Sequence, residues 1–279
     1  MFAPALAQLP SADFFWGPVS FRDYTVKHGF RARQQAPKYI SIDHYLGLSA
    51  ELRRAETMVL RLGDAEGTGT QFGLARVPGD LGSFFINDME DDAEAETFLP
   101  TTGLDQLFPF LLIGNMAEAN LVNLGFASGL FGEALKLDQD CSQPFPARGN
   151  GRYTFPVRPH SSLDAIIEHR AGQVETDAMF VARRHGRQTL FVIEAKVGLG
   201  TRSIAKHKLV YPVLAVAERV PSDMPIVPVY VRILGSADGL SFCVSECEPL
   251  PRLTVPAIDE LTVISRRTLR VPNILSGFQ

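Results

Sequence analysis

Two neighbouring stretches of the chain combine strand-forming residues with charges at one end, and this pair constrains the fold more than any other feature. Residues 174–182 and 189–197 are rich in β-branched, aromatic and other apolar side chains, which favour β-strands. The polar residues 183–188 between them contain a glycine, as expected for the turn of a hairpin. We therefore predict a β-hairpin whose turn is centred on His185 and Gly186.

A turn at this position places four charged residues at the same end of the hairpin. It sets Asp177 opposite Glu194 and Glu175 opposite Lys196. Because side chains alternate between the two faces of a strand, all four point to one face, and the opposite face is almost wholly apolar. Both faces are expected to be buried except at this charged corner. An unpaired charge there would cost several kcal/mol in desolvation, so the corner requires ion pairs or a bound metal.

Two interpretations of the charged corner are open. In the first, it is an ion-pair cluster at the end of two strands, with Glu175 on Lys196 and Asp177 in solvent. In the second, the carboxylates are the hard oxygen ligands that Mg²⁺ requires, and Lys196 orients or activates the water that attacks a phosphodiester. Carboxylates from two facing strands beside an ammonium favour the second interpretation.

Three short motifs follow one another around this corner. They are QVETDA at Gln173–Ala178, IEAK at Ile193–Lys196 and KLVYP at Lys208–Pro212. The ordered set resembles the PD-(D/E)XK nuclease superfamily, in particular its type II restriction-endonuclease-like branch, over roughly residues 111–235. Two positions depart from that pattern. Lys208 stands where the branch tends to have glutamine, and Thr176 stands in place of the proline that often precedes the aspartate.

The resemblance implies a fold and a chemistry. The expected fold is α/β, a restriction-endonuclease-like core in which helices flank a mixed central sheet. The expected reaction is hydrolysis of DNA with Mg²⁺, for which Mn²⁺ can substitute. The resemblance implies metal ligands at Asp177, at Glu194 and at the backbone carbonyl of Ala195, and it implies that Lys196 positions or activates the water.

Two further acids are candidates for a second metal or for orienting the water. Glu118 lies near the start of a helix predicted over residues 115–137, in the stretch that resembles the superfamily's first core helix. A carboxylate at a helix start is also favourable to the helix dipole, and the sequence does not separate the two roles. Glu175 is the other candidate.

Positive charge is concentrated around the proposed site, although the net charge of −4 argues against a generic nucleic-acid binder. Residues 145–208 carry 11 Lys/Arg and 5 Asp/Glu, whereas residues 1–100 carry 9 and 14. A phosphate backbone would lie against such charge. The alternative is a solvated basic hairpin tip and helix. The residues expected to contact nucleic acid are Arg183, Arg184, Arg187, Arg202, Lys206 and Lys208.

The rest of the chain divides at an acidic run over residues 87–96, which we interpret as a solvated loop. Residues 1–100 form a predicted N-terminal α+β module, the natural carrier of DNA sequence recognition, and residues 101–279 form the catalytic domain. Residues 1–30 are expected to begin as a loop, with the aromatic residues 14–16 anchoring an N-terminal arm to the core, and Ser49 caps a short helix. A helix capped by Thr201 or Ser203 is expected to run toward Tyr211. Further strands are predicted at residues 57–62, 71–77, 83–87, 152–157, 164–169, 226–234 and 241–245.

The predicted function is therefore a type II restriction-type endonuclease acting on double-stranded DNA. Such enzymes commonly work as dimers that cut both strands of a symmetric site, so a homodimer is expected. A repair or RNA-directed nuclease is one rival, and a non-catalytic nucleic-acid- or protein-binding module of a defence system is another. No apolar run reaches the ~18 residues of a membrane span. The three cysteines and the absence of a signal peptide pattern indicate a cytoplasmic protein.

Overall fold

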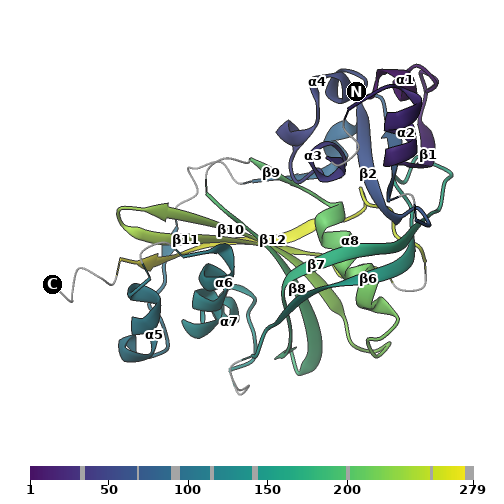
Figure 1. The fold of residues 1–279 in the computed structure, drawn as a ribbon. Coiled ribbons are helices and arrows are strands. Elements are labelled where there is room, and N and C mark those ends of the chain that lie inside the picture. Colours follow the sequence, from purple (N-terminus) through teal and green to yellow (C-terminus); the bar gives the residue numbers. More distant parts are fainter. Residues whose placement is uncertain are drawn as a thin grey trace.

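The computed structural model describes residues 1–31, 35–67, 69–88, 95–113, 116–139, 144–198, 202–251 and 254–273. Within these ranges, eight α-helices surround a mixed ten-stranded sheet, so the fold is α/β as expected. No helix in the described part of the chain is long and apolar enough to cross a membrane. Figure 1 shows most of the elements of the first quarter of the chain gathered at one end of the molecule.

The strand order in the large sheet is β1-β3-β2-β7-β8-β10-β11-β12-β5, and β6 pairs with β7 beside this path. Strands β4 and β9 form a separate antiparallel pair. The strands are β1 (Phe14–Ser20), β2 (Thr57–Asp64), β3 (Thr70–Arg76), β4 (Phe85–Asn87), β5 (Glu96–Thr97), β6 (Ala147–Val157), β7 (Ile167–Arg184), β8 (Arg187–Val197), β9 (Ser203–Ala205), β10 (Ile226–Ser236), β11 (Gly239–Cys247) and β12 (Val263–Pro272). Most predicted strands are thereby confirmed, with shifted ends.

The helices lie on both faces of the sheet. They are α1 (Ala3–Leu6), α2 (Phe21–Lys27), α3 (Ala36–Ile40), α4 (Ala50–Arg54), α5 (Leu104–Leu111), α6 (Glu118–Ala127), α7 (Leu130–Ala134) and α8 (His207–Ala217), with 3-10 turns at Tyr45–Gly47 and Leu81–Phe84. Helices α6 and α7 pack on the face that carries Phe180, Phe191 and Ile193. Helix α8 covers the other face, where Val213 contacts the cluster containing Val192. The two faces predicted for the hairpin are thus both buried.

The hairpin of β7 and β8 has the predicted turn. Residues pair in the expected register from Arg184 opposite Arg187 to Ala178 opposite Ile193. The turn residues His185 and Gly186 have φ angles of 53° and 74°. Two positive φ angles are those of a type I′ turn, which matches the twist of the flanking strands.

Beyond Ala178 the register prediction is wrong, because β8 leaves β7 there. Glu175 pairs with Asn150 of β6 instead of facing Lys196. Near the other end of β7, β2 meets it through one bridge between Gly63 and Arg170. Among the described residues, β7 between this bridge and Ala178 pairs with β6 alone. This arrangement leaves an opening along β7 between β2 and β8, and the candidate site described below lies in that opening.

The bridge between β2 and β7 depends on a glycine. Gly63 has φ 91°, and a Cβ atom there would lie 2.1 Å from the carbonyl oxygen of Arg170. Any side chain would therefore push the strands apart. Apolar residues of both parts of the chain, such as Leu60, Phe72, Phe155 and Val157, share one buried cluster.

Several predictions for individual segments are wrong for identifiable reasons. Residues 1–30 do not begin as a loop but form α1, β1 and α2, although their aromatic side chains do anchor them to the core as expected, with the ring centroids of Trp16 and Phe72 5.7 Å apart. The predicted helix over residues 115–137 is two helices, because Gly129 adopts φ 82° between α6 and α7. Residues 114 and 115 lie outside the described residues.

The segment after β8 also differs from its prediction. Ser203 belongs to β9, whose Ile204 pairs with Ile86 of β4, so it caps no helix. Helix α8 begins at His207 and contains Pro212 in its interior. Thr201 lies outside the described residues. The acidic run is only partly described, and Asp88 in it forms a buried ion pair with Arg232.

Candidate active site

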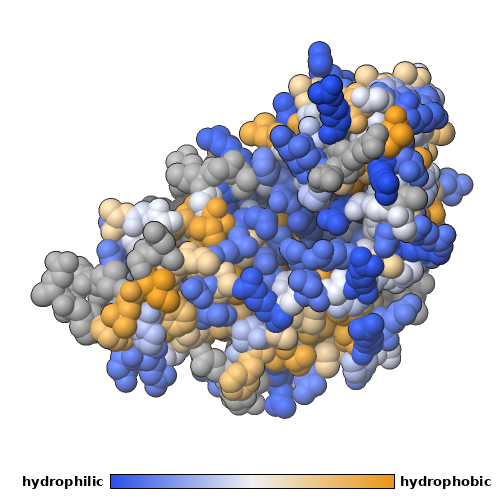
Figure 2. Space-filling model, viewed as in Figure 1, coloured by the Kyte–Doolittle hydropathy of each residue, from blue (hydrophilic) through white to orange (hydrophobic). Residues whose placement is uncertain are grey.

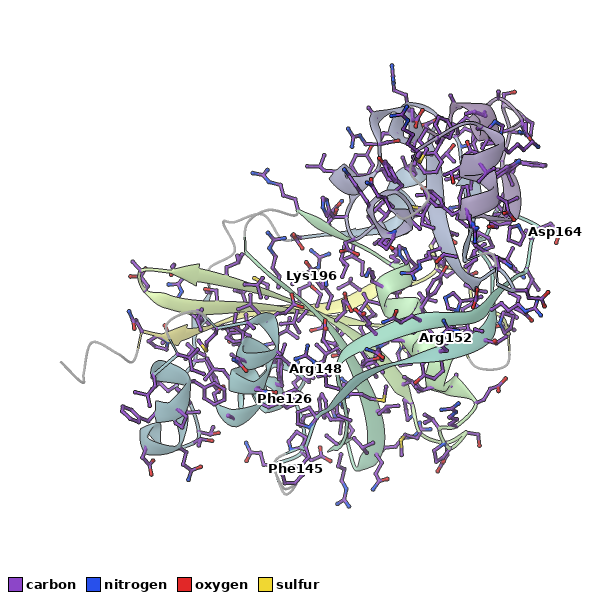
Figure 3. The ribbon with its side chains drawn as sticks, viewed as in Figure 1. Phe126, Phe145, Arg148, Arg152, Asp164 and Lys196 are labelled. Carbon is purple, nitrogen blue, oxygen red and sulfur yellow. The ribbon has the colours of Figure 1, made fainter. Side chains whose placement is uncertain are left out.

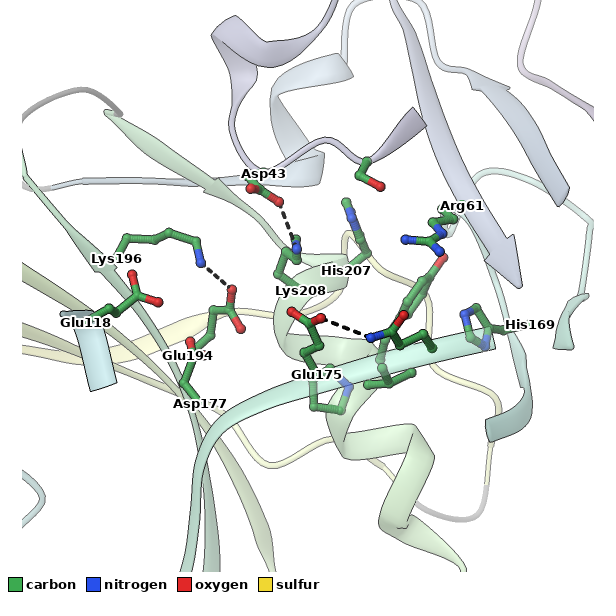
Figure 4. A pocket seen from close by; sticks show the side chains of 15 residues that line it. Asp43, Arg61, Glu118, His169, Glu175, Asp177, Glu194, Lys196, His207 and Lys208 are labelled. Carbon is green, nitrogen blue, oxygen red and sulfur yellow. Dashed lines mark hydrogen bonds and ion pairs between the residues drawn. The ribbon is translucent and has the colours of Figure 1, made fainter. Parts of the chain in front are cut away.

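A cavity of about 340 Å³ opens where β8 leaves β7. Its wall combines residues of β7 and β8, the first residue of α6, the start of α8, and Ser41, Asp43 and Arg61 from the N-terminal part. Figure 4 shows Glu118 and Lys196 at one end of this cavity and Arg61 at the other. In space-filling view, hydrophilic side chains line a hollow between the N-terminal elements and the main body (Figure 2).

Glu194 and Lys196 form an ion pair within β8. Their side chains lie on the same face because they are two residues apart, and Lys196 Nζ is 2.7 Å from Glu194 Oε1. Glu194 is only 6% exposed. Burial, together with the negative charge of Asp177, raises the pKa of Glu194 to about 7, although the positive charge of Lys196 opposes this. Burial acts to lower the pKa of Lys196, but the surrounding carboxylates outweigh it and raise that pKa.

Asp177 holds β8 at the point where the strand ladder ends. Its Oδ2 accepts a hydrogen bond of 2.8 Å from the backbone nitrogen of Ala195. This bond links Asp177 of one predicted motif to Ala195 of another, at a point where β7 and β8 no longer form ladder pairs. Asp177 is therefore not the free, solvated carboxylate of the ion-pair interpretation.

Glu118 lies at the start of a helix and also in the wall of the cavity, the two positions predicted for it. It is the first residue of α6, and its half-buried side chain lines the cavity. Burial raises the pKa of Glu118, Lys196 lowers it and Asp177 raises it, so the three groups are close enough to interact. The helix start delivers this acid to the cluster.

Glu175 lines the same cavity but stands apart from the lysine. Its side chain is exposed and accepts a hydrogen bond of 3.1 Å from Gln173 Nε2. Lys196 pairs with Glu194, so the predicted pairing of Glu175 with Lys196 is wrong. The reason is again the divergence of β8 from β7.

The acid–lysine cluster, which we define as Glu118, Asp177, Glu194 and Lys196, carries three carboxylates and one ammonium. Asp177 raises the pKa of both Glu118 and Glu194. The single ammonium of Lys196 therefore does not compensate the negative charge of the three carboxylates. Hard oxygen donors with excess negative charge fit a divalent cation such as Mg²⁺. Among the described residues, however, no three or more His, Cys, Asp or Glu side chains are already grouped as a metal site.

Of the six residues expected to contact nucleic acid, all of them described, only Lys208 lines this cavity. Its Nζ is 2.8 Å from Asp43 Oδ1. Lys206 Nζ donates to the carbonyl of Asp259 at 2.6 Å, and Arg202 is exposed and follows the undescribed residues 199–201.

The three arginines of the hairpin tip lie far from the acid–lysine cluster. Arg187 precedes Glu194 by seven residues of β8, which is roughly 23 Å along a strand. Arg184 pairs with Glu246 at 2.6 Å, and Arg187 donates to the carbonyl of Asp223 at 2.8 Å. Arg183 lies on the same tip, in β7. The tertiary structure therefore separates this part of the predicted basic region from the cavity.

Several residues of the cavity were not predicted from the sequence. They are Ser41, Asp43, Arg61, His169 and His207. Arg148 of β6 also acts on the cluster, because its charge lowers the pKa of Glu118, and Figure 3 places it beside the sheet below Lys196. No spacing in the sequence connects these positions, since they come from separate segments. Only the folded chain could identify them.

Comparison with curated proteins and with solved structures finds no match to this chain. A family model described as a domain of unknown function (DUF6997) matches residues 89–244, more than half of the chain. The matched range contains the whole acid–lysine cluster and Lys208, and it begins after Asp43 and Arg61. The protein therefore belongs to the DUF6997 family.

Proposed function

We propose that this protein is a Mg²⁺-dependent endonuclease that hydrolyses DNA phosphodiester bonds on a restriction-endonuclease-like core. The observation that carries the proposal is the meeting of Glu118, Asp177, Glu194 and Lys196 in one cavity at the end of a β-hairpin. Asp177, Glu194 and Lys196 come from the motifs that resemble the PD-(D/E)XK superfamily, and Glu118 comes from the stretch that resembles its first core helix. The mixed sheet, with α6 and α8 on its opposite faces, also supports such a core.

Each residue of the acid–lysine cluster has a role in the proposed reaction. Asp177, Glu194 and the backbone carbonyl of Ala195 hold the cation, and Glu118 assists with a second cation or with orientation. Bound Mg²⁺ supplies polarisation of the scissile phosphate and a lowered pKa of a water ligand. Lys196, fixed by its ion pair to Glu194, orients the attacking water and balances negative charge that develops on the phosphate.

The proposed substrate is double-stranded DNA cut in a sequence-specific manner, as by a type II restriction enzyme. A homodimer would cut both strands of a symmetric site. The excess of Lys/Arg in residues 145–208 supports a polyanionic substrate, although only part of that charge lies at the cavity. A repair or RNA-directed nuclease would use the same cluster and differs only in the nucleic acid it accepts.

A non-catalytic binding module of a defence system is the second candidate, and two observations favour it. Glu194 and Lys196 satisfy each other at 2.7 Å, and the described residues contain no preformed group of three metal-binding side chains. A structural ion pair would have the same appearance. The uncompensated carboxylates Glu118 and Asp177 beside this pair argue for the catalytic reading.

The test is cleavage of supercoiled plasmid, unmethylated phage DNA and single-stranded RNA in Mg²⁺, in Mn²⁺ and in EDTA. Asp177→Asn removes one cation ligand, and Asp164→Asn is the matched control because Asp164 is exposed and outside the cavity. Discrete bands that need the metal and vanish only in Asp177→Asn support a restriction-type enzyme. A smear with the same dependence keeps the hydrolysis but removes sequence specificity. Intact DNA and RNA under all conditions favour the non-catalytic module.

A further inference from the structure

The end of the cavity opposite the acid–lysine cluster has its own set of polar groups. Arg61 of β2 points into it, and Figure 4 shows Arg61 and His169 there with Lys208 and His207 between them and the cluster. Among the described residues, the half-buried guanidinium of Arg61 has neither a hydrogen bond nor an ion pair. An arginine without a protein partner at the wall of a cavity can bind an anion with several hydrogen bonds.

Three buried polar atoms in the same wall also lack partners. They are the hydroxyl of Tyr211, Nδ1 of His207 and Oγ of Ser41. Tyr211 is 7% exposed and His207 is 6% exposed, so water has little access to either side chain. A buried polar atom that stays unsatisfied destabilises the folded chain. Three of them beside an unpaired arginine indicate a site that is completed by a hydrogen-bonding ligand.

The chemistry of these groups selects an anion. Arg61 supplies a positive charge and several N–H donors, and the hydroxyls of Tyr211 and Ser41 donate as well. Burial keeps His207 uncharged, so its ring can donate from Nδ1 without requiring a negative partner of its own. The neighbouring Lys208 is already paired with Asp43. A tetrahedral group with several acceptor oxygens, such as a phosphate, matches these donors better than a nucleobase or a cation.

The position of Arg61 indicates how a strand would continue. Arg61 and Gln173 line a second cavity of about 400 Å³, which includes Thr70, Asn150 and Arg152. Arg61 and Gln173 therefore belong to the walls of both cavities. A nucleic-acid strand that ran from the acid–lysine cluster into the second cavity would pass Arg61.

We propose that Arg61, Tyr211, His207 and Ser41 bind a backbone phosphate of the nucleic-acid strand whose scissile phosphate lies at the acid–lysine cluster. This assignment rests on the proposed nuclease function for the identity of the strand. It gives the N-terminal part of the chain a direct place in substrate binding, because Ser41 and Arg61 both come from it.

The experiment measures binding of a fluorescein-labelled DNA duplex and single strand to the full chain in EDTA, by anisotropy over a range of salt concentrations. Arg61→Gln is expected to weaken binding about tenfold and to reduce the salt slope by about one, because one phosphate contact is lost. Tyr211→Phe removes only the hydroxyl and is expected to weaken binding about fivefold with the salt slope unchanged. Arg22→Gln, an exposed charge change in α2, is the matched control and leaves binding unchanged.

Methylphosphonate substitution locates the phosphate. One neutral linkage is moved along the oligonucleotide, and the linkage that weakens binding to the wild type is expected to have no further effect on Arg61→Gln. Equal binding by the wild type, Arg61→Gln and Tyr211→Phe overturns the assignment, as does failure of the wild type to bind any DNA or RNA oligonucleotide. If Arg61→Gln does not fold, the DNA binding of Tyr211→Phe alone decides whether the assignment holds. Because EDTA prevents metal-dependent cleavage, loss of binding in the variants supports the site even where the wild type cleaves nothing.

Discussion

Lys196 Nζ lies 2.7 Å from Glu194 Oε1, so the lysine of the cluster is held by an acid of its own strand. The two side chains share a face of β8, and both lie where β7 has turned away to pair with β6 alone. The ammonium is thus fixed beside Glu118 and Asp177, whose carboxylates also act on its pKa. A lysine constrained in this way can orient a water at one end of the cavity.

Replacing this lysine should abolish most hydrolysis while the fold persists. Lys196→Met retains the length of the side chain but removes the ammonium, and we expect the cleavage rate to fall about 10²–10⁴-fold. The exposed Lys136 provides the control, since Lys136→Met should cleave as the wild type does. Single-turnover cleavage and circular dichroism measure the two effects. A Lys196→Met protein that cleaves at the wild-type rate would remove the lysine from the mechanism.

The two additional acids should differ in importance. Glu118 is half-buried and interacts with Lys196 and Asp177, whereas Glu175 is exposed and contacts Gln173. We expect Glu118→Gln to lower cleavage about 10–100-fold, as loss of a group supporting a metal site does. Glu175→Gln should change it by less than about threefold. The opposite order of the two cleavage rates would mean that Glu175 is the supporting acid.

The buried ion pair between Arg232 and Asp88 should contribute strongly to stability. Their side chains are 6% and 9% exposed, and Arg232 also donates to the carbonyl of Gly198 at 2.7 Å. Arg232→Met leaves the carboxylate of Asp88 buried without its charged partner, so the free energy of unfolding in urea should fall by about 3–5 kcal/mol. Adding Asp88→Asn should restore part of this loss. A single-variant loss below about 1 kcal/mol would contradict the importance of the pair.

Gly63 should tolerate no side chain. Gly63→Ala combines a φ of 91° with a Cβ placed 2.1 Å from the carbonyl oxygen of Arg170. Gly79→Ala is a matched control, because its φ is 80° and nothing lies within 4 Å of the added atom. Both variants should lose about 1–2 kcal/mol from the left-handed backbone. Gly63→Ala should lose about 1–3 kcal/mol more from the clash, measured by urea unfolding. Equal losses would show that the bridge of β2 to β7 relaxes freely.

His169 should make the protein sensitive to acid. Burial, with the charge of Arg61 acting in the same direction, lowers the pKa of His169 from 6.5 to about 4. Its ring stacks on Phe155, with centroids 4.5 Å apart. As the pH falls from 6.5 to about 4, the unfolded chain binds a proton that the folded protein does not. The free energy of unfolding should therefore fall by up to about 3 kcal/mol over this range.

The variant His169→Gln isolates this contribution. Urea unfolding between pH 7.5 and pH 4 should show a smaller decrease for His169→Gln than for the wild type. His185→Asn serves as the control, because His185 is exposed at the hairpin tip and asparagine tolerates its positive φ. Parallel pH profiles for wild type and His169→Gln would mean that His169 takes up its proton without unfolding.

Much of the hairpin could be predicted from local patterns. Stretches rich in β-branched, aromatic and other apolar residues identified the hairpin strands at residues 174–182 and 189–197, and the short turn between them placed the pairing as far as Ala178 and Ile193. Ser49 was recognisable as the cap of α4, because a cap depends only on neighbouring residues, and its side chain accepts from Leu52 N. The division into residues 1–100 and 101–279 stays a prediction. Strands β1–β3 of the first part join the same sheet as β7.

The sequence by itself determined which charged residues share one end of the hairpin, because strand periodicity and turn position are local properties. Only the tertiary structure decided that β8 leaves β7 after Ala178, that Lys196 pairs with Glu194, and that Arg61 closes the far end of the cavity. Those outcomes depend on how far β8 stays paired with β7 and on where β2 joins β7. The contact between Gly63 of β2 and Arg170 of β7 joins residues more than a hundred positions apart, and no local pattern records it.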